Sequence, residues 1–306
     1  MSAETARADP IAGVGLAVAS FGLWGLLPVY FKAVEMLPAT EVLAHRVVWS
    51  LLWTGLLLTV VVQWSAVRAA FAERRMVATL AGSALLIGIN WLIFIWAVAH
   101  DRVLEASLGY FITPLFNVLT GRIFLGEALG RTRALAVALA AVGVGWMLWQ
   151  VGVVPWVGLS LGALFATYGL VRKMAPVAAA PGLFVETALL TPFAAVYLGW
   201  LAWQGSGAFG TVGPAFDGLL VAAGLVTALP LILFAGAARR LRLTTVGLLF
   251  YMTPTMQMLL AVLAFGEPFT VDHAVTFACI WLALALYSGR SLYQYRVDRA
   301  RLETPH

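Results

Sequence analysis

The sequence has few charged residues and a single cysteine. Only 11% of its 306 residues are Asp, Glu, Lys or Arg, whereas 62% are apolar, and soluble domains carry about 25% charged residues. This shortage of charge excludes an ordinary water-soluble domain, a disordered chain and a nucleic-acid-coating protein. With Cys279 alone, the chain forms no intramolecular disulfide, CxxC metal site or thiol framework. The composition predicts a protein surrounded mostly by hydrocarbon.

Apolar runs long enough to cross a bilayer recur along the whole chain. A hydrocarbon core about 30 Å thick requires about 20 apolar residues per helix, and charge, proline and glycine separate ten such runs. We expect transmembrane helices at residues 11–31, 40–63, 77–99, 104–125, 134–151, 156–171, 183–203, 219–238, 243–265 and 274–288. The pattern therefore predicts an all-α integral membrane protein with ten transmembrane helices.

The basic residues of the loops are concentrated on one side of these helices. Fifteen Lys and Arg residues fall on the side of the N-terminus, and only Lys32 and Arg102 fall on the other side. Because short cytoplasmic loops are enriched in Lys and Arg, we expect cytoplasmic tails at residues 1–10 and 291–306. The net charge of +5 then reflects topology. The first apolar run is too long for a signal peptide, so we expect the N-terminal tail to be uncleaved.

The two halves of the sequence resemble each other. A shift of 140 residues aligns Thr113-Pro114 with Thr253-Pro254, and Gly126-Glu127 with Gly266-Glu267. We therefore expect two five-helix repeats, at residues 11–151 and 152–290. Since five is odd, the second repeat enters the membrane inverted, which is the plan of many secondary transporters.

Three segments of the chain resemble one family of bacterial membrane proteins. They read GLWGLLPVYFK (residues 22–32), ATEVLAHRVVWS (39–50) and INWLIFIWAVAHDRVLEASLGYFITPLFNVLTGRIFLGE (89–127). They closely resemble the RarD branch of the EamA family, in the drug/metabolite transporter superfamily of bacterial inner membranes, and the resemblance covers almost the whole chain. It implies a ten-helix basket with alternating access through a central cavity, and a link to chloramphenicol sensitivity, after which the branch is named.

Arg46 is the most informative ionisable residue within the predicted spans. A charge in hydrocarbon is costly unless it faces a cavity or a partner, and Arg46 lies about 12 Å into the second span at 1.5 Å per residue. It is expected near the bilayer midplane. Two interpretations are open: Arg46 binds an anionic or zwitterionic group of a substrate, or it forms a structural ion pair with Glu41 or bonds a helix carbonyl.

Three further ionisable residues are candidates for proton coupling or gating. Glu41 and His45 are four residues apart on one helical face, and burial brings the pKa of such groups toward neutrality. Alternatively, Glu41 is a first-turn residue favoured by the helix dipole and His45 is a satisfied neutral histidine. Glu186 is the repeat counterpart of Glu41, expected near the opposite side of the membrane, where it gates the second entrance or simply reaches interfacial water.

Proline, amide and aromatic residues complete the predicted site. Pro28, Pro114 and Pro254 are expected hinges, or sites of fixed curvature. Amides in the spans line the cavity or bond neighbouring helices, and aromatic rings line it or pack. The predicted substrate-binding set, besides Arg46, is Trp24, Tyr30, Trp49, Asn90, Trp91, Tyr110, Asn117, Tyr168, Tyr251 and Gln257.

The sequence favours a secondary transporter that exports small metabolites or drugs, of amino-acid-like, aromatic or chloramphenicol-like type, driven by a proton or substrate gradient. No ATP-binding motif, phosphate loop or metal-ligand cluster occurs, so we expect no cofactor and no metal. We expect no nucleic-acid partner, and a monomer or weak homodimer in the lipid bilayer. Two other classes remain open: a non-transporting partner or receptor subunit, and a membrane enzyme acting on a lipid-linked substrate with Glu41 and His45 as acid and base.

Overall fold

The computed structural model describes residues 10–126, 130–152, 154–238, 240–241, 246 and 249–303, and this part of the chain is helical without β-strands. The helices are α1 (Pro10–Gly25), α2 (Leu27–Ala33), α3 (Ala39–Val60), α4 (Trp64–Ala72), α5 (Arg74–Ala99), α6 (Val103–Leu125), α7 (Arg131–Val151), α8 (Trp156–Met174), α9 (Ala179–Trp203), α10 (Pro214–Ala238), α12 (Met252–Leu259), the π-helix η1 (Leu260–Ala264) and α13 (Val271–Glu303). A helix satisfies its own backbone amides and carbonyls, which an apolar solvent demands.

Six helical segments are long and apolar enough to cross a membrane. They are Ile11–Ala33, which includes both α1 and α2, and Ala39–Val60, Arg74–Ala99, Val103–Phe124, Ala179–Trp203 and Pro214–Phe234. Three shorter apolar helices are Ala134–Gln150, Met252–Ala264 and Val271–Leu286. The sequence-based expectation of an all-helical protein with many membrane spans is confirmed.

The helices do not correspond one to one with the ten predicted spans. The first span is broken at Leu26, and the amphipathic helix α4 lies between the second and third spans. The last helix is one rod from Val271 to Glu303, so it continues beyond the predicted span end at 288. The ninth predicted span began at residue 243, but residues 242–245 lie outside the described residues, as do Glu127 and the first nine residues.

The break in the first span has a clear cause in the sequence. Pro28 lacks an amide proton and its ring clashes with the carbonyl four residues earlier, so Trp24 loses its helical hydrogen bond. The amide Nε2 of Gln257 in α12 donates to this carbonyl oxygen of Trp24 at 3.2 Å. A helix from the other half of the chain thus repairs the break that proline creates.

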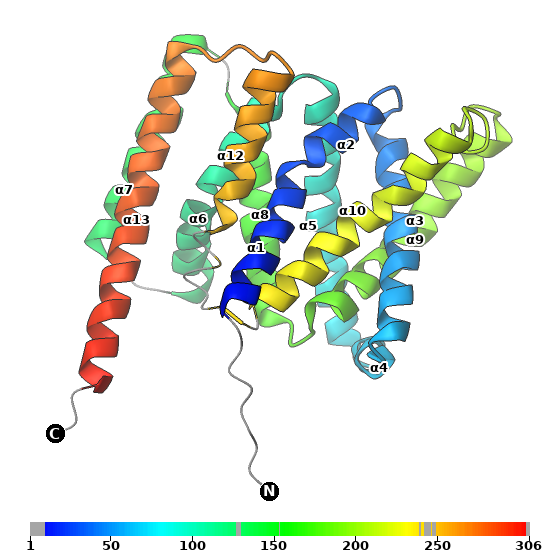
Figure 1. Cartoon of the computed structure of the whole chain (residues 1–306), viewed down its shortest axis with the longest axis horizontal. Helices are drawn as coiled ribbons and strands as arrows, with labels where there is room; N and C mark the ends of the chain where they lie inside the picture. The colour runs from blue at the N-terminus through cyan, green and yellow to red at the C-terminus, as the bar shows by residue number, and fades with distance from the viewer. Residues whose placement is uncertain are drawn as a thin grey trace, which may run out of the picture.

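The helices form one bundle in which the two halves of the chain interleave (Figure 1). The helices α7 and α13 pack together at one edge, and α3 packs against α9 toward the other edge. Between them, α10 contacts both α1 and α3, while α6 contacts α8. Segments far apart in sequence are therefore direct neighbours in space.

Small residues allow some of these helices to approach closely. A Cβ added at Gly109 of α6 would overlap the backbone of Gly158 in α8, and one at Gly162 would overlap Gly109 and Phe116. Small residues at one face let the backbones of membrane helices meet. The stripe formed by Gly158 and Gly162 therefore packs helices within the chain.

Acidic side chains hold the ends of helices in place. Glu267, in the loop after η1, accepts the amide protons of Val103 and Leu104 at 2.7 and 2.8 Å, and Glu105 accepts that of Val157 at 2.7 Å. The first amides of a helix lack intrahelical partners, so the two glutamates cap α6 and α8. Burial raises the pKa of Glu267, although the two amide donors oppose that shift.

Candidate substrate site

Arg46 is buried in the middle of the bundle and is surrounded by aromatic rings. Its side chain is 4% exposed, and its guanidinium lies 4.1 Å from the centre of the Trp91 ring and 5.5 Å from that of Phe31. Tyr30 and Tyr110 lie within electrostatic range of the same group. We call this cluster, with Thr227, the Arg46 site. It brings together four of the residues predicted from the sequence.

The charge of Arg46 has no anionic partner among the described residues. Its Nε donates to the hydroxyl of Thr227 at 2.9 Å, its Nη1 is buried without a hydrogen bond, and no described carboxylate lies within 4 Å of it. The predicted alternative of an ion pair with Glu41 is wrong, because Oε1 of Glu41 instead accepts the amide proton of Ala208 at 2.8 Å. A buried cation with a free donor in a ring of π-systems suits an anionic ligand.

Glu41 and His45 face one cavity on the other side of α3. They line a space of about 330 Å³ together with Trp49, as their helical spacing predicted. The Nε2 atom of His45 and the Nε1 atom of Trp49 are buried there without a hydrogen-bond partner. Of the predicted site residues in α3, Arg46 therefore lies in the Arg46 site, whereas Glu41, His45 and Trp49 line this cavity.

Glu186 lies toward the opposite end of the bundle, near the start of α9, and is completely buried. Ser83 of α5 donates to its Oε1 at 2.5 Å, and the hydroxyl of Tyr168 donates to its Oε2 at 3.4 Å. The Nε of Arg172 lies 3.7 Å from Oε1. Four side chains from three helices therefore form a polar cluster, and the alternative that Glu186 reaches interfacial water is not what the structure shows.

The predicted amides mainly join helices. Asn90 is buried and its Nδ2 donates to the carbonyl of Leu161 in α8 at 3.1 Å, while Gln257 holds the Trp24 carbonyl as described above. Asn117 is exposed on the outside of α6. These placements favour interhelical bonding over cavity lining, and Asn117 lies apart from the Arg46 site.

The remaining aromatic candidates pack within the core. Trp24 contacts Phe21 and Phe234 with ring centres 5.9 Å apart in both cases, and Tyr251 lies 6.4 Å from Phe111. The hydroxyl of Tyr30 donates to the carbonyl of Leu219 at 2.8 Å. Of the proline candidates, Pro28 follows the helix break, Pro114 lies inside α6, and Pro254 lies in the first turn of α12. Their role as hinges stays a prediction.

Several neighbours in these clusters were not predicted, among them Phe31 and Ser83. Thr227, a polar residue within a long apolar run, carried a sequence signal, since an isolated hydroxyl in hydrocarbon calls for a partner. Arg172 was counted only as a loop cation. Phe209 lies in a glycine-rich loop between α9 and α10, where no periodic pattern indicates what it contacts.

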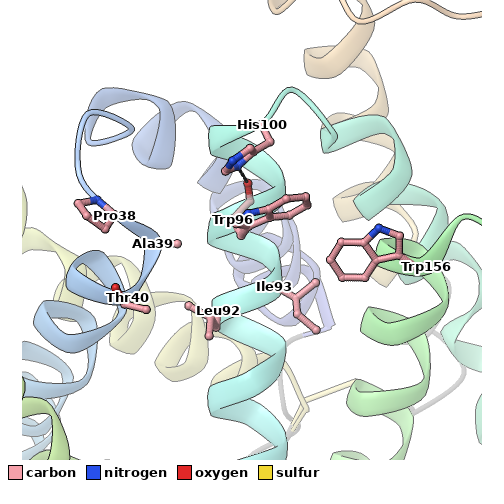
Figure 2. Close-up of a pocket in the computed structure, with 8 residues that line it drawn as sticks. All are labelled: Pro38, Ala39, Thr40, Leu92, Ile93, Trp96, His100 and Trp156. Atoms are coloured by element: carbon pink, nitrogen blue, oxygen red, sulfur yellow. Dashed lines mark hydrogen bonds between the residues drawn. The ribbon is translucent and has the colours of Figure 1, made fainter.

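A second, larger cavity lies at the end of the bundle where α3 begins. It has a volume of about 500 Å³ and is lined by residues of α3, α5 and α8. Figure 2 shows the Trp96 and Trp156 side chains opposite the chain at Pro38–Thr40, with His100 above. The ring centres of the two tryptophans are 5.2 Å apart. The Nδ1 atom of His100 bonds the Trp96 carbonyl at 2.8 Å. Arg46 lines neither cavity.

Comparison with known proteins identifies relatives along nearly the full chain. Protein RarD of Salmonella typhi is 48% identical over 284 residues, covering 93% of this chain and 97% of that protein. An uncharacterized transporter of Vibrio cholerae is 46% identical, covering 92% and 93%. This chain belongs to the RarD branch of the EamA family. It is a multi-pass membrane transporter, as the RarD branch and the six apolar helices indicate.

Other comparisons add detail to the RarD assignment. A Pseudomonas aeruginosa relative named chloramphenicol-sensitive protein RarD is 38% identical, covering 90% of this chain and 92% of its own. One crystal structure, titled only as that of a protein, is similar with a TM-score of 0.57 at 18% identity, covering 91% of this chain and 97% of its own. That likeness shows a shared fold alone. No family model matches the sequence.

Proposed function

We propose that this RarD protein exports small solutes that carry an anionic group and an aromatic or planar part, and that Arg46 binds the anionic group. The single observation that carries the proposal is the buried guanidinium of Arg46 with an unpartnered Nη1 and no described carboxylate nearby. Retaining such a charge costs about 2.5–3.5 kcal/mol at the centre of a membrane helix. A ligand that pairs with it offsets that cost.

The neighbours of Arg46 define the rest of the solute. Trp91 and Phe31 already stack on the guanidinium, and Tyr30 and Tyr110 lie nearby. Concave sites commonly combine aromatic walls with a few polar anchors. Aromatic amino acids, which carry a carboxylate beside a ring, suit this combination. Chloramphenicol-like compounds, to which the name of the Pseudomonas relative points, are uncharged and offer Arg46 only nitro or carbonyl oxygens.

An inverted-repeat transporter with ten spans is the architecture that best accounts for the helix neighbours. If α1–α2, α3, α5, α6 and α7 correspond to α8, α9, α10, α12–η1 and α13, the contacts come in matched pairs. The contact of α6 with α8 corresponds to that of α12 with α1, and the contact of α5 with α9 to that of α10 with α3. Inverted repeats of this kind support alternating access by rocking of one half against the other.

The polar clusters at the two ends of the bundle suit the role of gates. At one end the Glu41 carboxylate accepts a hydrogen bond from the Ala208 amide. At the other end Glu186 accepts hydrogen bonds from Ser83 and Tyr168 and forms an ion pair with Arg172. Arg46 is 4% exposed and lines neither cavity, so a solute reaches it only when helices separate. Protonation of either carboxylate weakens its contacts, which is how a proton gradient drives the cycle.

The orientation follows from the basic loops. The excess of Lys and Arg on the side of the N-terminus supports an orientation with both termini in the cytoplasm, in a bacterial inner membrane. The cavity beside Trp96 and the start of α3 then faces outward (Figure 2). The Glu186 cluster is the cytoplasmic gate.

Transport in proteoliposomes tests the proposal. Proteoliposomes that contain the purified protein are loaded with labelled amino acids, aromatic acids or chloramphenicol. Efflux of each solute is followed with and without an imposed pH gradient. We expect at least one anionic aromatic solute to move, Arg46→Met to abolish that movement, and Glu41→Gln to remove its dependence on the gradient. Arg122→Met, at an exposed arginine of α6, is the matched control and should transport normally. Equal transport by Arg46→Met would refute the proposed site.

A further inference from the structure

A cavity that Arg46 does not line lies beside α3. It is the cavity of about 330 Å³ between α3, the end of α9 and the loop that follows α9, and we call it the α3–α9 pocket. Its apolar walls are Val48, Leu198, Gly199, Leu201, Ala202 and Phe209. Since Gly199, Ala202 and Phe209 are exposed, the pocket opens onto the outside of the bundle.

Two side chains that line this pocket each carry a buried polar atom without a hydrogen-bond partner. The His45 Nε2 and Trp49 Nε1 atoms are buried without a hydrogen bond, and the two residues are four apart on one face of α3. A buried donor left unpaired is destabilising. Two such groups on side chains that line one cavity indicate a ligand that pairs with them.

The chemistry of the walls selects the ligand. The indole N–H of Trp49 only donates, so the ligand contributes an acceptor oxygen. The Glu41 side chain lines the same pocket and disfavours a negatively charged acceptor. The Phe209 ring lies 5.7 Å from that of His45 and 5.9 Å from that of Trp49, which favours an aromatic ligand between apolar walls.

We propose that the α3–α9 pocket binds an uncharged aromatic solute whose carbonyl, amide or nitro oxygen accepts the hydrogen of the Trp49 indole. The pocket thus differs in specificity from the Arg46 site, which takes an anion. Trp200 and Trp203, in the same last turns of α9 as Gly199 and Ala202, are 46% and 85% exposed, as tryptophans at a membrane interface are. The solute therefore enters from the membrane interface. This inference does not depend on transport through the Arg46 site.

Photolabelling with benzophenone tests the proposal. Benzophenone is an uncharged aromatic ketone of suitable size, and light couples it to nearby C–H bonds, which peptide mass spectrometry locates. We expect labelling of the wild-type chain at residues 45–49 or 198–209. At sub-saturating probe, Trp49→Phe should lower this labelling about five- to tenfold, the effect of one lost hydrogen bond of about 1–1.4 kcal/mol. Ala202→Leu, which fills the mouth, should also lower it.

Matched controls separate specific binding from partitioning into lipid. Trp53→Phe changes an indole one turn further along α3 that already donates to the carbonyl of Val221 at 3.2 Å, and this variant should label like the wild type. The anionic probe 4-benzoylbenzoate should show no dependence on Trp49. Equal benzophenone labelling of wild type and Trp49→Phe, or labelling only at other sites, would overturn the proposal. A Trp49-dependent signal from the anion would overturn the selection for uncharged ligands.

Discussion

Buried Arg46 and half-buried Arg172 provide a sharp comparison. Arg46 has no described carboxylate partner, whereas Arg172 lies 3.7 Å from the buried carboxylate of Glu186. We predict that Arg46→Met and Arg172→Met have opposite consequences. The first abolishes solute binding with little change in stability, and the second destabilises the fold.

The magnitudes follow from the contacts. Replacing Arg46 loses a desolvated cation–π contact with Trp91, about 2 kcal/mol, and a charged hydrogen bond to Thr227, about 1.5–3 kcal/mol. It also removes the cost of a central charge, about 2.5–3.5 kcal/mol. These contributions largely cancel, so the free energy of unfolding should fall by no more than about 2.5 kcal/mol.

Replacing Arg172 leaves the Glu186 carboxylate buried without its cation. Breaking a buried ion pair on one side costs about 3–5 kcal/mol, and the hydrogen bonds from Ser83 and Tyr168 favour the lower end of that range. The double variant Arg172→Met with Glu186→Gln should recover part of the loss, because no charge remains.

Denaturant unfolding of the detergent-solubilised protein, followed by tryptophan fluorescence, measures these differences. The expected order of stability is wild type close to Arg46→Met, then the double variant, then Arg172→Met. If Arg46→Met is destabilised as much as Arg172→Met, then Arg46 has a structural partner and the reasoning fails.

Two further predictions concern helix ends and helix crossings. Glu267→Ala removes the acceptor of two amides at the start of α6 and should lower the free energy of unfolding by about 1–2 kcal/mol in the same assay; an unchanged value would mean that water replaces the carboxylate. Gly224→Ala places a Cβ against the backbone of Trp49 and should cost about 1–3 kcal/mol by overpacking, with reduced efflux in proteoliposomes because α3 shifts. Gly218→Ala in the same helix meets no atom within 4 Å, so equal effects of the two variants would refute the close crossing.

The sequence allowed the helical class and the key cation to be predicted, because both depend on local composition. Apolar runs indicate spans by length, and one arginine within a run stands out by its cost. The spacing of Glu41 and His45 predicted one shared helical face, and both residues line the same cavity. These features need no knowledge of which helices are neighbours.

The partners of these residues depended on tertiary structure and were not predictable. The partners of Arg46, Thr227 in α10 and Trp91 in α5, lie far from it in sequence, and Glu41 bonds a loop amide at Ala208 instead of Arg46. Such pairings are set by helix crossings that small residues permit. Pro28 indicated a helix break, but nothing local indicated that Gln257 would repair it.

The central claim is that Arg46 recognises an anionic group, and paired competitors test it most directly. For a transported carboxylate and its uncharged carboxamide, the inhibition constants against efflux are measured in wild type and in Arg46→Met. We predict that the wild type prefers the carboxylate by about 10- to 100-fold, the effect of one charge-assisted hydrogen bond, and that the variant shows a ratio near one. An unchanged preference in Arg46→Met would contradict the account.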